Sequence, residues 1–198
     1  EAHRQRIRKA LGIGEEQYLG EPIGRDTLAA LCLSASVIAG KEEGASLGVF
    51  TADHLIEPEG EFRNLVARGY ELVEAHPDTL LTFGVPPTCP ATGSGYLELG
   101  EVFFDPARLV RRFQEKPDLP TAEKYVAAGP ERYLWNSGMF IWKVRTFLAC
   151  VERYEPELCG AVRNIASAWN TARRKTLLAA VYPSLKKTSV DYGVMERA

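Results

Sequence analysis

Apolar residues recur at helical spacing in several stretches of this chain, and short runs that are apolar throughout stand between them. Positions three and four apart share one face of a helix, so these stretches predict amphipathic helices. The clearest example follows Asp26 or Thr27, either of which can cap it, and its apolar face consists of Leu28, Leu31, Cys32, Ala35 and Ala39. Further helices are expected at residues 2–11, 62–73 and 121–128, and in two or three pieces between residues 144 and 181.

The continuously apolar runs and the alternating segments predict strands. These are expected at residues 46–51, 80–85, 95–104, 109–114 and 139–142. The pair around Asp105-Pro106 is predicted to form an antiparallel insertion and residues 135–138 a turn. The chain ends at the motif of residues 191–196, and no final element is expected after it. Because strands and helices alternate, the sequence favours an α/β fold with a largely parallel sheet.

Composition restricts the class of protein. The 198 residues favour one domain, and 45% hydrophobic with 25% charged residues is typical of globular chains and argues against disorder. The net charge of −2 provides no basic surface for nucleic acid. No apolar run approaches the ~20 residues that a membrane span requires. We therefore expect no nucleic-acid partner and no membrane partner.

The cysteines and the first residues indicate the compartment. The four cysteines contain no C-x-x-C pair, so free, mostly buried thiols in a reducing cytosol are expected. The charged start does not resemble a signal peptide, and a cytoplasmic protein is predicted. Because the chain does not open with Met, we interpret residues 1–198 as a single partial domain that is truncated at both ends.

The loop at residues 21–27 is the first candidate site. Its Pro and Gly residues open a helix, and a helix start offers free backbone N–H groups and the positive end of the dipole. The Glu21 carboxylate has two acceptor oxygens. These match the adjacent N1–H and N2–H₂ donors of guanine, a pair that adenine and uracil lack. The alternative, in which Glu21 is a solvated loop residue and Asp26 only a helix cap, stays open.

Two carboxylates far apart in the sequence are candidates for a metal site. Asp53 follows a buried strand, where open α/β sheets place their ligands, and Asp191 follows an apolar position near the end of the chain. Carboxylate oxygens are ligands that Mg²⁺ prefers, so the two residues would share one ion. The alternative is that Asp53 only caps the following loop.

Three further segments would suit a sugar phosphate. The two glycines of Thr92-Gly93-Ser94-Gly95-Tyr96 let the backbone approach a ligand closely. In Glu115-Lys116-Pro117 the Lys suits a phosphate and the Glu suits vicinal sugar hydroxyls. An amide in Trp135-Asn136-Ser137-Gly138 would reach a sugar. A plain loop for the first and an ion-pairing edge strand for the second remain alternatives.

Taken in order, these segments resemble the mannose-1-phosphate guanylyltransferase branch of the sugar-phosphate nucleotidyltransferases. The resemblance extends from about residue 18 to the end of the chain. The matching motifs are Glu21-Pro22-x-Gly24-Arg25, Ala52-Asp53-His54, Thr82-Phe83-Gly84, Thr92-Gly93-x-Gly95-Tyr96, Glu115-Lys116-Pro117, Trp135-Asn136-Ser137-Gly138 and Ser189-x-Asp191-Tyr192-x-Val194-Met195-Glu196.

The resemblance implies a Rossmann-like nucleotidyltransferase core with a mixed, mainly parallel sheet, and it implies a reaction. A phosphate oxygen of mannose 1-phosphate would attack the α-phosphorus of GTP and release pyrophosphate, with Mg²⁺ as cofactor. Catalytic roles would fall to Asp53, Lys116 and Asp191, and the metal to Asp53 and Asp191. The nucleotide would be bound by Glu21, Gly24, Arg25, Thr27 and Asp53. The sugar phosphate would be bound by Gly95, Glu115, Lys116, Asn136 and Gly138.

The chain departs from this family pattern at three points. The family's first strand, with its G-x-G-x-R phosphate loop, is absent, so an unpaired sheet edge is expected and the isolated chain would be inactive. Asp26 stands where the family has Asn, and Ser94 stands where it has Tyr. The same class with another sugar or nucleotide, and a non-catalytic sugar-nucleotide binding protein, are the alternatives. A homodimer is left open.

Overall fold

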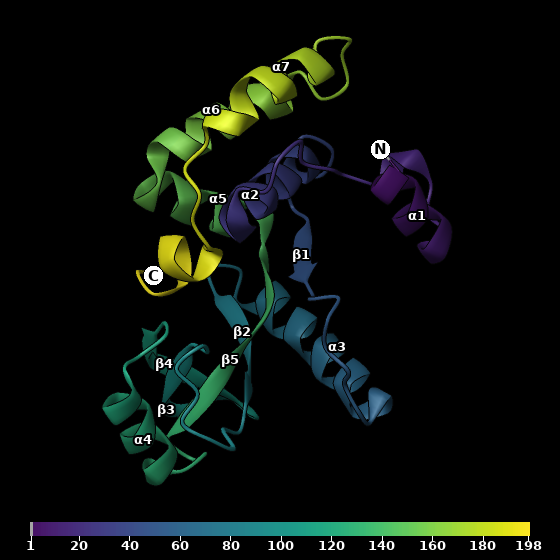
Figure 1. Cartoon of the computed structure of the whole chain (residues 1–198). Coiled ribbons are helices and arrows are strands. Elements are labelled where there is room, and N and C mark those ends of the chain that lie inside the picture. Colours follow the sequence, from purple (N-terminus) through teal and green to yellow (C-terminus); the bar gives the residue numbers. More distant parts are fainter. Residues whose placement is uncertain (1) are drawn as a thin grey trace.

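The computed structural model describes residues 2–198, with side chains from residue 6 onward except at residue 16, and contains an open mixed α/β fold (Figure 1). Its helices are α1 (Ala2–Leu11), η1 (Glu15–Gln17), α2 (Asp26–Ala39), α3 (Glu59–Ala75), α4 (Leu119–Ala128), α5 (Val144–Tyr154), α6 (Pro156–Ser167), α7 (Arg174–Val181), η2 (Tyr182–Ser184) and η3 (Asp191–Met195). Its strands are β1 (Ser46–Val49), β2 (Leu80–Val85), β3 (Tyr96–Phe104), β4 (Ala107–Gln114) and β5 (Tyr133–Lys143).

The apolar pattern located these helices and most of the strands. Each predicted helix is confirmed, the stretch from residue 144 to 181 contains three, and the hairpin around residues 105–106 is antiparallel as expected. Residues 135–138 are not a turn, however, but the middle of β5. The pairing of β5 with β2 shifts register here, and Gly138 has a φ of +72°. An irregularity of this kind attracts the same Gly and Asn residues as a turn, which explains the error.

The sheet has its longest strand, β5, at its centre. The strands β1 and β2 both pair with the same stretch of β5, residues 140–142, so they lie on its opposite edges. The strand β3 pairs with the other end of β5, and β4 with β3. No other strand pairs with the far edge of β1 in the described part of the chain, which is consistent with the expected open edge.

The expectation of a mainly parallel sheet is wrong for the strands described, because each of their pairings is antiparallel. The segment β1–α3–β2 does return its second strand in the direction of the first, as in a βαβ unit. However, β5 runs the opposite way between these two strands. The alternation of elements in the sequence revealed the crossover but not the strand inserted into it.

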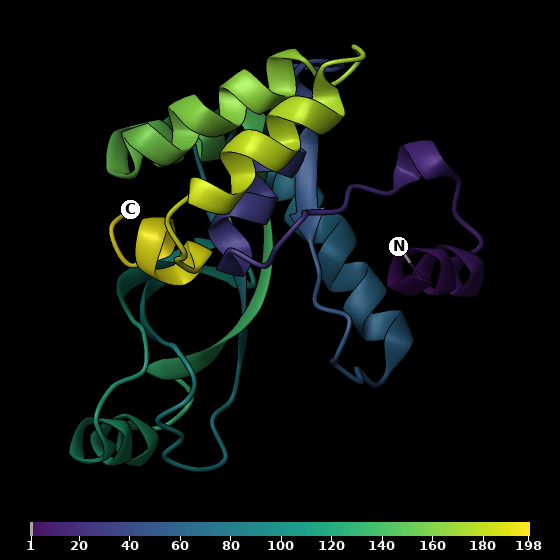
Figure 2. The same ribbon diagram turned by 45° about the horizontal axis from the view of Figure 1, so that its top comes forward.

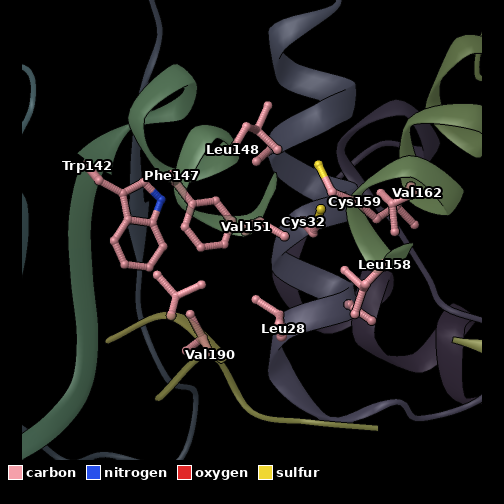
Figure 3. Packing of buried hydrophobic residues seen from close by; sticks show 14 of the residues in the cluster. Leu28, Cys32, Trp142, Phe147, Leu148, Val151, Leu158, Cys159, Val162 and Val190 are labelled. Atoms are coloured by element: carbon pink, nitrogen blue, oxygen red, sulfur yellow. The ribbon is translucent and has the colours of Figure 1, made fainter. Parts of the chain in front are cut away.

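The main core lies between β5 and the helices α2, α5 and α6. The rings of Trp142 and Phe147 stack there with centroids 4.5 Å apart. The sulfurs of Cys32 on α2 and Cys159 on α6 lie close together deep in this core (Figure 3). All four cysteines are free, as expected, and these two are buried, whereas Cys89 is exposed.

The C-terminal segment contains an element that the sequence did not predict. Residues 191–195 form the π-helix η3, which lies between the helical layer and the hairpin of β3 and β4 (Figures 1 and 2). Val190, Val194 and Met195 are buried. A Cβ at Gly193 would lie only 2.5 Å from Leu28 Cδ2, so glycine allows η3 to approach α2 closely.

Two further findings concern surfaces. None of the described helices combines the length and apolar character that crossing a membrane would require. The helix α1 stands apart from the body of the chain in both overall views (Figures 1 and 2).

Candidate functional site

Asn136 lies at the centre of the predicted site residues and joins two strands to the C-terminal segment. Its side-chain nitrogen donates a hydrogen bond to Asp191 Oδ1 at 2.9 Å, and its side-chain oxygen accepts one from the Thr82 hydroxyl at 2.7 Å. Its backbone N–H donates to the carbonyl of Gly95 at 2.8 Å. Both polar ends of the amide are therefore oriented by the protein itself, which is how precise sites are supported.

Asp191 sits in surroundings that disfavour its charged form. Burial is the main cause and repulsion by the Glu115 carboxylate the next, and together they raise the pKa of Asp191 to about 6. The hydrogen bond from Asn136 and the charge of Lys116 act in the opposite direction without compensating. A bound cation would favour the carboxylate form, so the site is electrostatically suited to one.

Glu115 follows β4 directly and is 8% exposed. Its backbone N–H donates to Glu196 Oε1 at 3.2 Å, and its carboxylate is near enough to Asp191 to raise that residue's pKa. A Cβ at Gly95 would lie 2.5 Å from Glu115 Oε2. The glycine motif and the Glu115-Lys116 motif therefore form one continuous wall, and only glycine permits so close an approach.

Lys116 provides the positive charge of this cluster. Its φ is +44°, a value that residues other than glycine seldom adopt. Its Nζ lies 3.1 Å from Glu115 Oε1 and 5.8 Å from the centroid of the Tyr192 ring. The hydrogen bond and the charge of Glu115 raise the pKa of Lys116, so the ammonium group stays charged beside Asp191.

The loop before α2 forms a second group of predicted site residues. Glu21 Oε2 accepts a hydrogen bond of 2.6 Å from the hydroxyl of Tyr182, whose pKa is raised by burial and by this carboxylate. The Nε atom of Arg25 is buried and has no hydrogen-bond partner among the described residues. A buried donor of this kind is costly unless a ligand or water satisfies it. The exposed Gly24 has open space where a Cβ would stand.

Residues 188–191 connect this loop to the Asn136 cluster. The backbone N–H of Leu28 donates to the carbonyl of Thr188 at 3.2 Å, and the N–H of Val190 donates to the Thr27 hydroxyl at 2.9 Å. Asp191, the next residue, accepts the bond from Asn136. Leu28 and Val190 also face the same core (Figure 3). Two motif groups more than a hundred residues apart in the sequence are thus held together by one short segment.

Asp26 has a φ of +64°, and its Oδ1 accepts a hydrogen bond of 2.9 Å from the N–H of Thr27. Asn and Asp are the residues other than glycine that tolerate this left-handed conformation, because their short polar side chains bond locally. This explains physically why Asp26 can replace the Asn of the family pattern. The difference between the two residues is the charge.

We expect Asp26→Asn in the full natural polypeptide to lower the KM for a nucleoside triphosphate by about fivefold. The change keeps the backbone conformation and removes roughly 1 kcal/mol of repulsion between like charges in a solvated loop. Steady-state kinetics would measure it, and Glu43→Gln, which removes a charge beyond the far end of α2, is the matched control. An unchanged KM in Asp26→Asn would contradict a phosphate near this loop.

Asp53 lies on the exposed loop between β1 and α3. The start of this loop runs beside β5, because a Cβ at Gly138 would lie 3.7 Å from Thr51 Cγ2. No hydrogen bond or ion pair of the Asp53 carboxylate is present among the described side chains. The structure therefore brings the loop next to the Asn136 strand, and the joint metal role of Asp53 and Asp191 stays a prediction.

The surroundings of Asp191 suit a magnesium ion whose other ligands would come largely from a substrate. Within residues 2–198, no three His, Cys, Asp or Glu side chains cluster into a ready metal site among those described. Mg²⁺ commonly binds one or two carboxylates, with phosphate and water as its other ligands. Asp191, whose ionisation is disfavoured in the absence of a cation, is chemically suited to this, and Asp53 stays the predicted second carboxylate.

A large groove of about 960 Å³ lies elsewhere, beside the outer edge of β2. Its walls come from α3, the hairpin of β3 and β4, and the C-terminal residues Met195, Glu196 and Ala198. None of the predicted site residues lines it. Its lining mixes apolar side chains with charged ones, among them Arg68, Arg108 and Arg153. Because none of the predicted site residues reaches it, we do not place a substrate there.

Three residues of these clusters had no role in the sequence analysis. Thr82 and Glu196 belong to motifs that match the family pattern. Thr82 bonds to the side chain of Asn136, and Glu196 bonds to the backbone of Glu115. Tyr182 stands in no motif, and only the folded chain brings it to Glu21. A residue that acts through another across a long separation in sequence leaves no local pattern.

The chain folds as a mixed α/β domain in which the loop before α2 and the Asn136 cluster lie close together. A family model described as nucleotidyl transferase matches residues 1–178. The chain belongs to the nucleotidyl transferase family, and the resemblance found in the motifs is confirmed.

Individual relatives agree with this assignment. The mannose-1-phosphate guanylyltransferase of Escherichia coli (strain K12) is 36% identical over 191 residues, which cover 92% of this chain and 39% of the relative. The xanthan biosynthesis protein XanB of Xanthomonas campestris pv. campestris (strain B100) is 35% identical, covering 94% of this chain and 39% of the relative. The chain thus spans about two fifths of the length of these curated relatives.

Among solved structures, a protein of Thermus thermophilus described as a mannose-1-phosphate geranyltransferase has a TM-score of 0.76 and 32% identity. The match covers 91% of this chain and 50% of that chain.

Proposed function

We propose that this chain carries the acceptor site and the base-recognition loop of a mannose-1-phosphate guanylyltransferase, which forms GDP-mannose and pyrophosphate from GTP and mannose 1-phosphate. The name of the Escherichia coli relative at 36% identity supports this substrate pair. The observation that carries the proposal is the segment 188–191, which bonds to the start of α2 on one side and to Asn136 on the other. A transferase must hold its two substrates next to each other in this way.

The donor nucleotide would bind at the loop before α2. Both oxygens of the Glu21 carboxylate keep lone pairs for the N1–H and N2–H₂ groups of guanine. The unpartnered Nε of Arg25 and the backbone around Gly24 and Thr27 would contact the rest of the nucleotide. Asp53, whose loop starts beside Gly138 on the Asn136 strand, would approach the phosphates together with the cation that balances them.

The acceptor would bind in the Asn136 cluster. Gly95 lets its backbone lie against the sugar, Glu115 and the free proton and lone pair of Asn136 would meet sugar hydroxyls, and the loop beside Gly138 would close the pocket. Lys116 would bind the phosphate of the sugar as a compact positive charge.

The chemistry requires no general base, because a phosphate oxygen is already a competent nucleophile. This chain would contribute alignment of that oxygen with the α-phosphorus, and Lys116 would offset the charge there. Mg²⁺ held by Asp53 and Asp191 would supply further charge neutralisation. The pyrophosphate leaves as the phosphate oxygen of mannose 1-phosphate bonds to the α-phosphorus.

Pyrophosphate release by the full natural polypeptide tests the proposal. The assay would contain Mg²⁺, mannose 1-phosphate and each of the four nucleoside triphosphates in turn. Release with GTP alone is the expected result. Release with another triphosphate would keep the enzyme class and overturn the base assignment. No release with any triphosphate, from folded protein, would contradict the proposed reaction.

We expect Glu21→Gln to lose most of the preference for GTP over ATP in the same assay. Glutamine offers one acceptor and one donor in place of two acceptors, and a good bidentate pair contributes about 1–3 kcal/mol of base discrimination, or roughly 5- to 150-fold. The Glu43→Gln variant is the control for loss of one negative charge. Full retention of the GTP preference in Glu21→Gln would remove this residue from the base site.

A further inference from the structure

We propose that Tyr182 is a positioning residue that presents the Glu21 carboxylate to the base. The inference rests on the proposed function, since it assigns Glu21 to base recognition. It starts from the 2.6 Å hydrogen bond that the Tyr182 hydroxyl donates to Glu21 Oε2 across 161 positions in the sequence.

The ring of Tyr182 is held in one position by the surrounding core. It begins η2, directly after α7 and before Pro183, and its side chain is fully buried in the core that contains α2 and α6. A ring packed in this way has one accessible orientation, because protein interiors are close-packed. Its hydroxyl oxygen is therefore a fixed point directly beneath an exposed loop.

Glu21, in contrast to Tyr182, has a side chain that can move. It is exposed and lies in a loop with Pro22 and Gly24, where a long carboxylate side chain has several rotamers. Among the described residues, the Tyr182 hydroxyl alone forms a hydrogen bond to the Glu21 side chain. The buried phenol thus selects one rotamer of an otherwise mobile carboxylate.

The bond has a fixed direction. Burial and the adjacent carboxylate raise the pKa of Tyr182 well above its usual range, so the phenol keeps its proton and always donates. Glu21 Oε2 keeps one lone pair and Oε1 keeps both. Two acceptors with a defined spacing remain, which is the pattern that a ligand edge with two adjacent donors requires.

Arg25 does not occupy the Glu21 carboxylate in the way that a ligand would. It lies close enough to lower the pKa of Tyr182 slightly, yet the structure contains no ion pair between Arg25 and Glu21 in its described part. The Nε of Arg25 is itself buried without a partner there. The loop thus holds a carboxylate without an ion pair and an arginine Nε without a hydrogen-bond partner among the described residues, as a site that awaits a ligand would.

Tyr182→Phe in the full natural polypeptide tests the inference, because it removes one oxygen and keeps the ring in the core. We expect the KM for GTP to rise about tenfold, since binding must now order one long side chain. The kcat should stay within about twofold, and the KM for mannose 1-phosphate should not change, because the chemistry and the acceptor pocket are untouched. The preference for GTP over ATP should fall by the same factor of about ten.

Three further variants separate positioning from stability. Glu21→Asp withdraws the carboxylate from the phenol at an exposed position, and it should raise the KM for GTP as Tyr182→Phe does. Adding Tyr182→Phe to Glu21→Gln should have no further effect on base preference, because the two residues act as one unit. Thr146→Val removes a side-chain hydrogen bond to the carbonyl of Pro77, away from the site, and should leave the GTP preference unchanged.

Each outcome decides a different claim. If the wild type prefers GTP and Tyr182→Phe keeps that preference, the positioning role is overturned while the proposed function stands. If both KM values rise together in Tyr182→Phe and in Thr146→Val, the residue acts through stability and the inference is equally overturned. A wild type with no preference for GTP overturns the proposed function and the inference with it.

Discussion

Asp191→Asn should abolish turnover and at the same time make the metal-free fold more stable. The loss of turnover, by at least about a hundredfold, follows from the removal of a carboxylate proposed to hold the cation, since metal ions contribute several kcal/mol of charge stabilisation to such reactions. The gain in stability follows from burial and from Glu115, which raise the pKa of Asp191 to about 6. Replacing a carboxylate whose charge is disfavoured in the folded state removes its function and, at the same time, its cost in stability.

The sign of the effect on stability can be stated for each pH range. Because the folded state binds the Asp191 proton more tightly than the unfolded state, the contribution of this group to stability is fully present below about pH 4 and lost as the pH rises through about 6. Above that range the loss approaches about 3 kcal/mol at most, from a shift of roughly two units. Asparagine does not titrate, so the variant should melt several degrees above the wild type at pH 7.5, and at about the same temperature at pH 4.

Thermal melts in EDTA at these two pH values provide the measurement. Asp118→Asn is a suitable control, because hydrogen bonding with Thr121, from its side chain and then from its backbone N–H, lowers the pKa of Asp118. The favourable contribution of Asp118 is present above its unfolded pKa and lost as the pH falls, so its replacement should not stabilise the protein at pH 7.5. Addition of Mg²⁺ with substrate should stabilise the wild type but not Asp191→Asn. A variant at position 191 with normal turnover would remove that residue from the metal site.

The helices could be predicted from the sequence because each buries one apolar face, and that face repeats every three or four residues. The pattern in α2 is an example, with Leu28, Cys32 and Ala35 fully buried. The antiparallel hairpin was also predictable, since its turn and both strands are neighbours in the sequence. In these elements local order alone determines the structure.

The sheet was less predictable, because partners of β5 come from far along the chain. Nothing in the sequence of β1 or β2 reveals that a strand some fifty or more residues later lies between them in the antiparallel direction. The irregularity at Asn136 has the same origin. It resembles a turn locally, and the pairing with β2 and β3 makes it part of a strand.

The candidate site could be assembled from the sequence as far as its motifs extend. The structure brings Gly95, Glu115, Lys116, Asn136 and Asp191 into one cluster. What the motifs could not show is how these residues are oriented. Thr82 orients the amide of Asn136, and Glu196 accepts a hydrogen bond from the backbone of Glu115. Both bonds exist only in the folded chain.

Gly95→Ala is the second substitution for which we expect a large effect on activity. It adds a methyl group and changes no charge, so it tests the packing of this cluster. The added methyl group would stand 2.5 Å from Glu115 Oε2 and 3.3 Å from the ring of Phe113. The first distance is too short for any real contact, so one group must move. The Glu115 carboxylate is the end of a flexible side chain and will yield before the backbone does.

The displaced Glu115 carboxylate has little room to move. Glu115 is buried, Lys116 holds one of its oxygens at 3.1 Å, and Asp191 repels it. Movement of Glu115 should break the contact proposed for the sugar hydroxyls and shift Lys116 away from the phosphate. Small misplacements at a reacting centre can lower rates by about a hundredfold, so we expect kcat/KM for mannose 1-phosphate to fall by roughly that factor.

Gly93→Ala is the matched control for Gly95→Ala, since it lies two residues earlier in the same motif and its added methyl would meet nothing within 4 Å. Neither glycine is among the residues with positive φ, so the comparison separates contact from backbone strain. Gly93→Ala should keep kcat/KM within about twofold, and both variants should keep the wild-type KM for GTP, because the base loop lies on the other side of residues 188–191. Equal activity of the two variants would show that Glu115 does not need its observed position for acceptor binding, and the assignment of the sugar pocket to this cluster would fail.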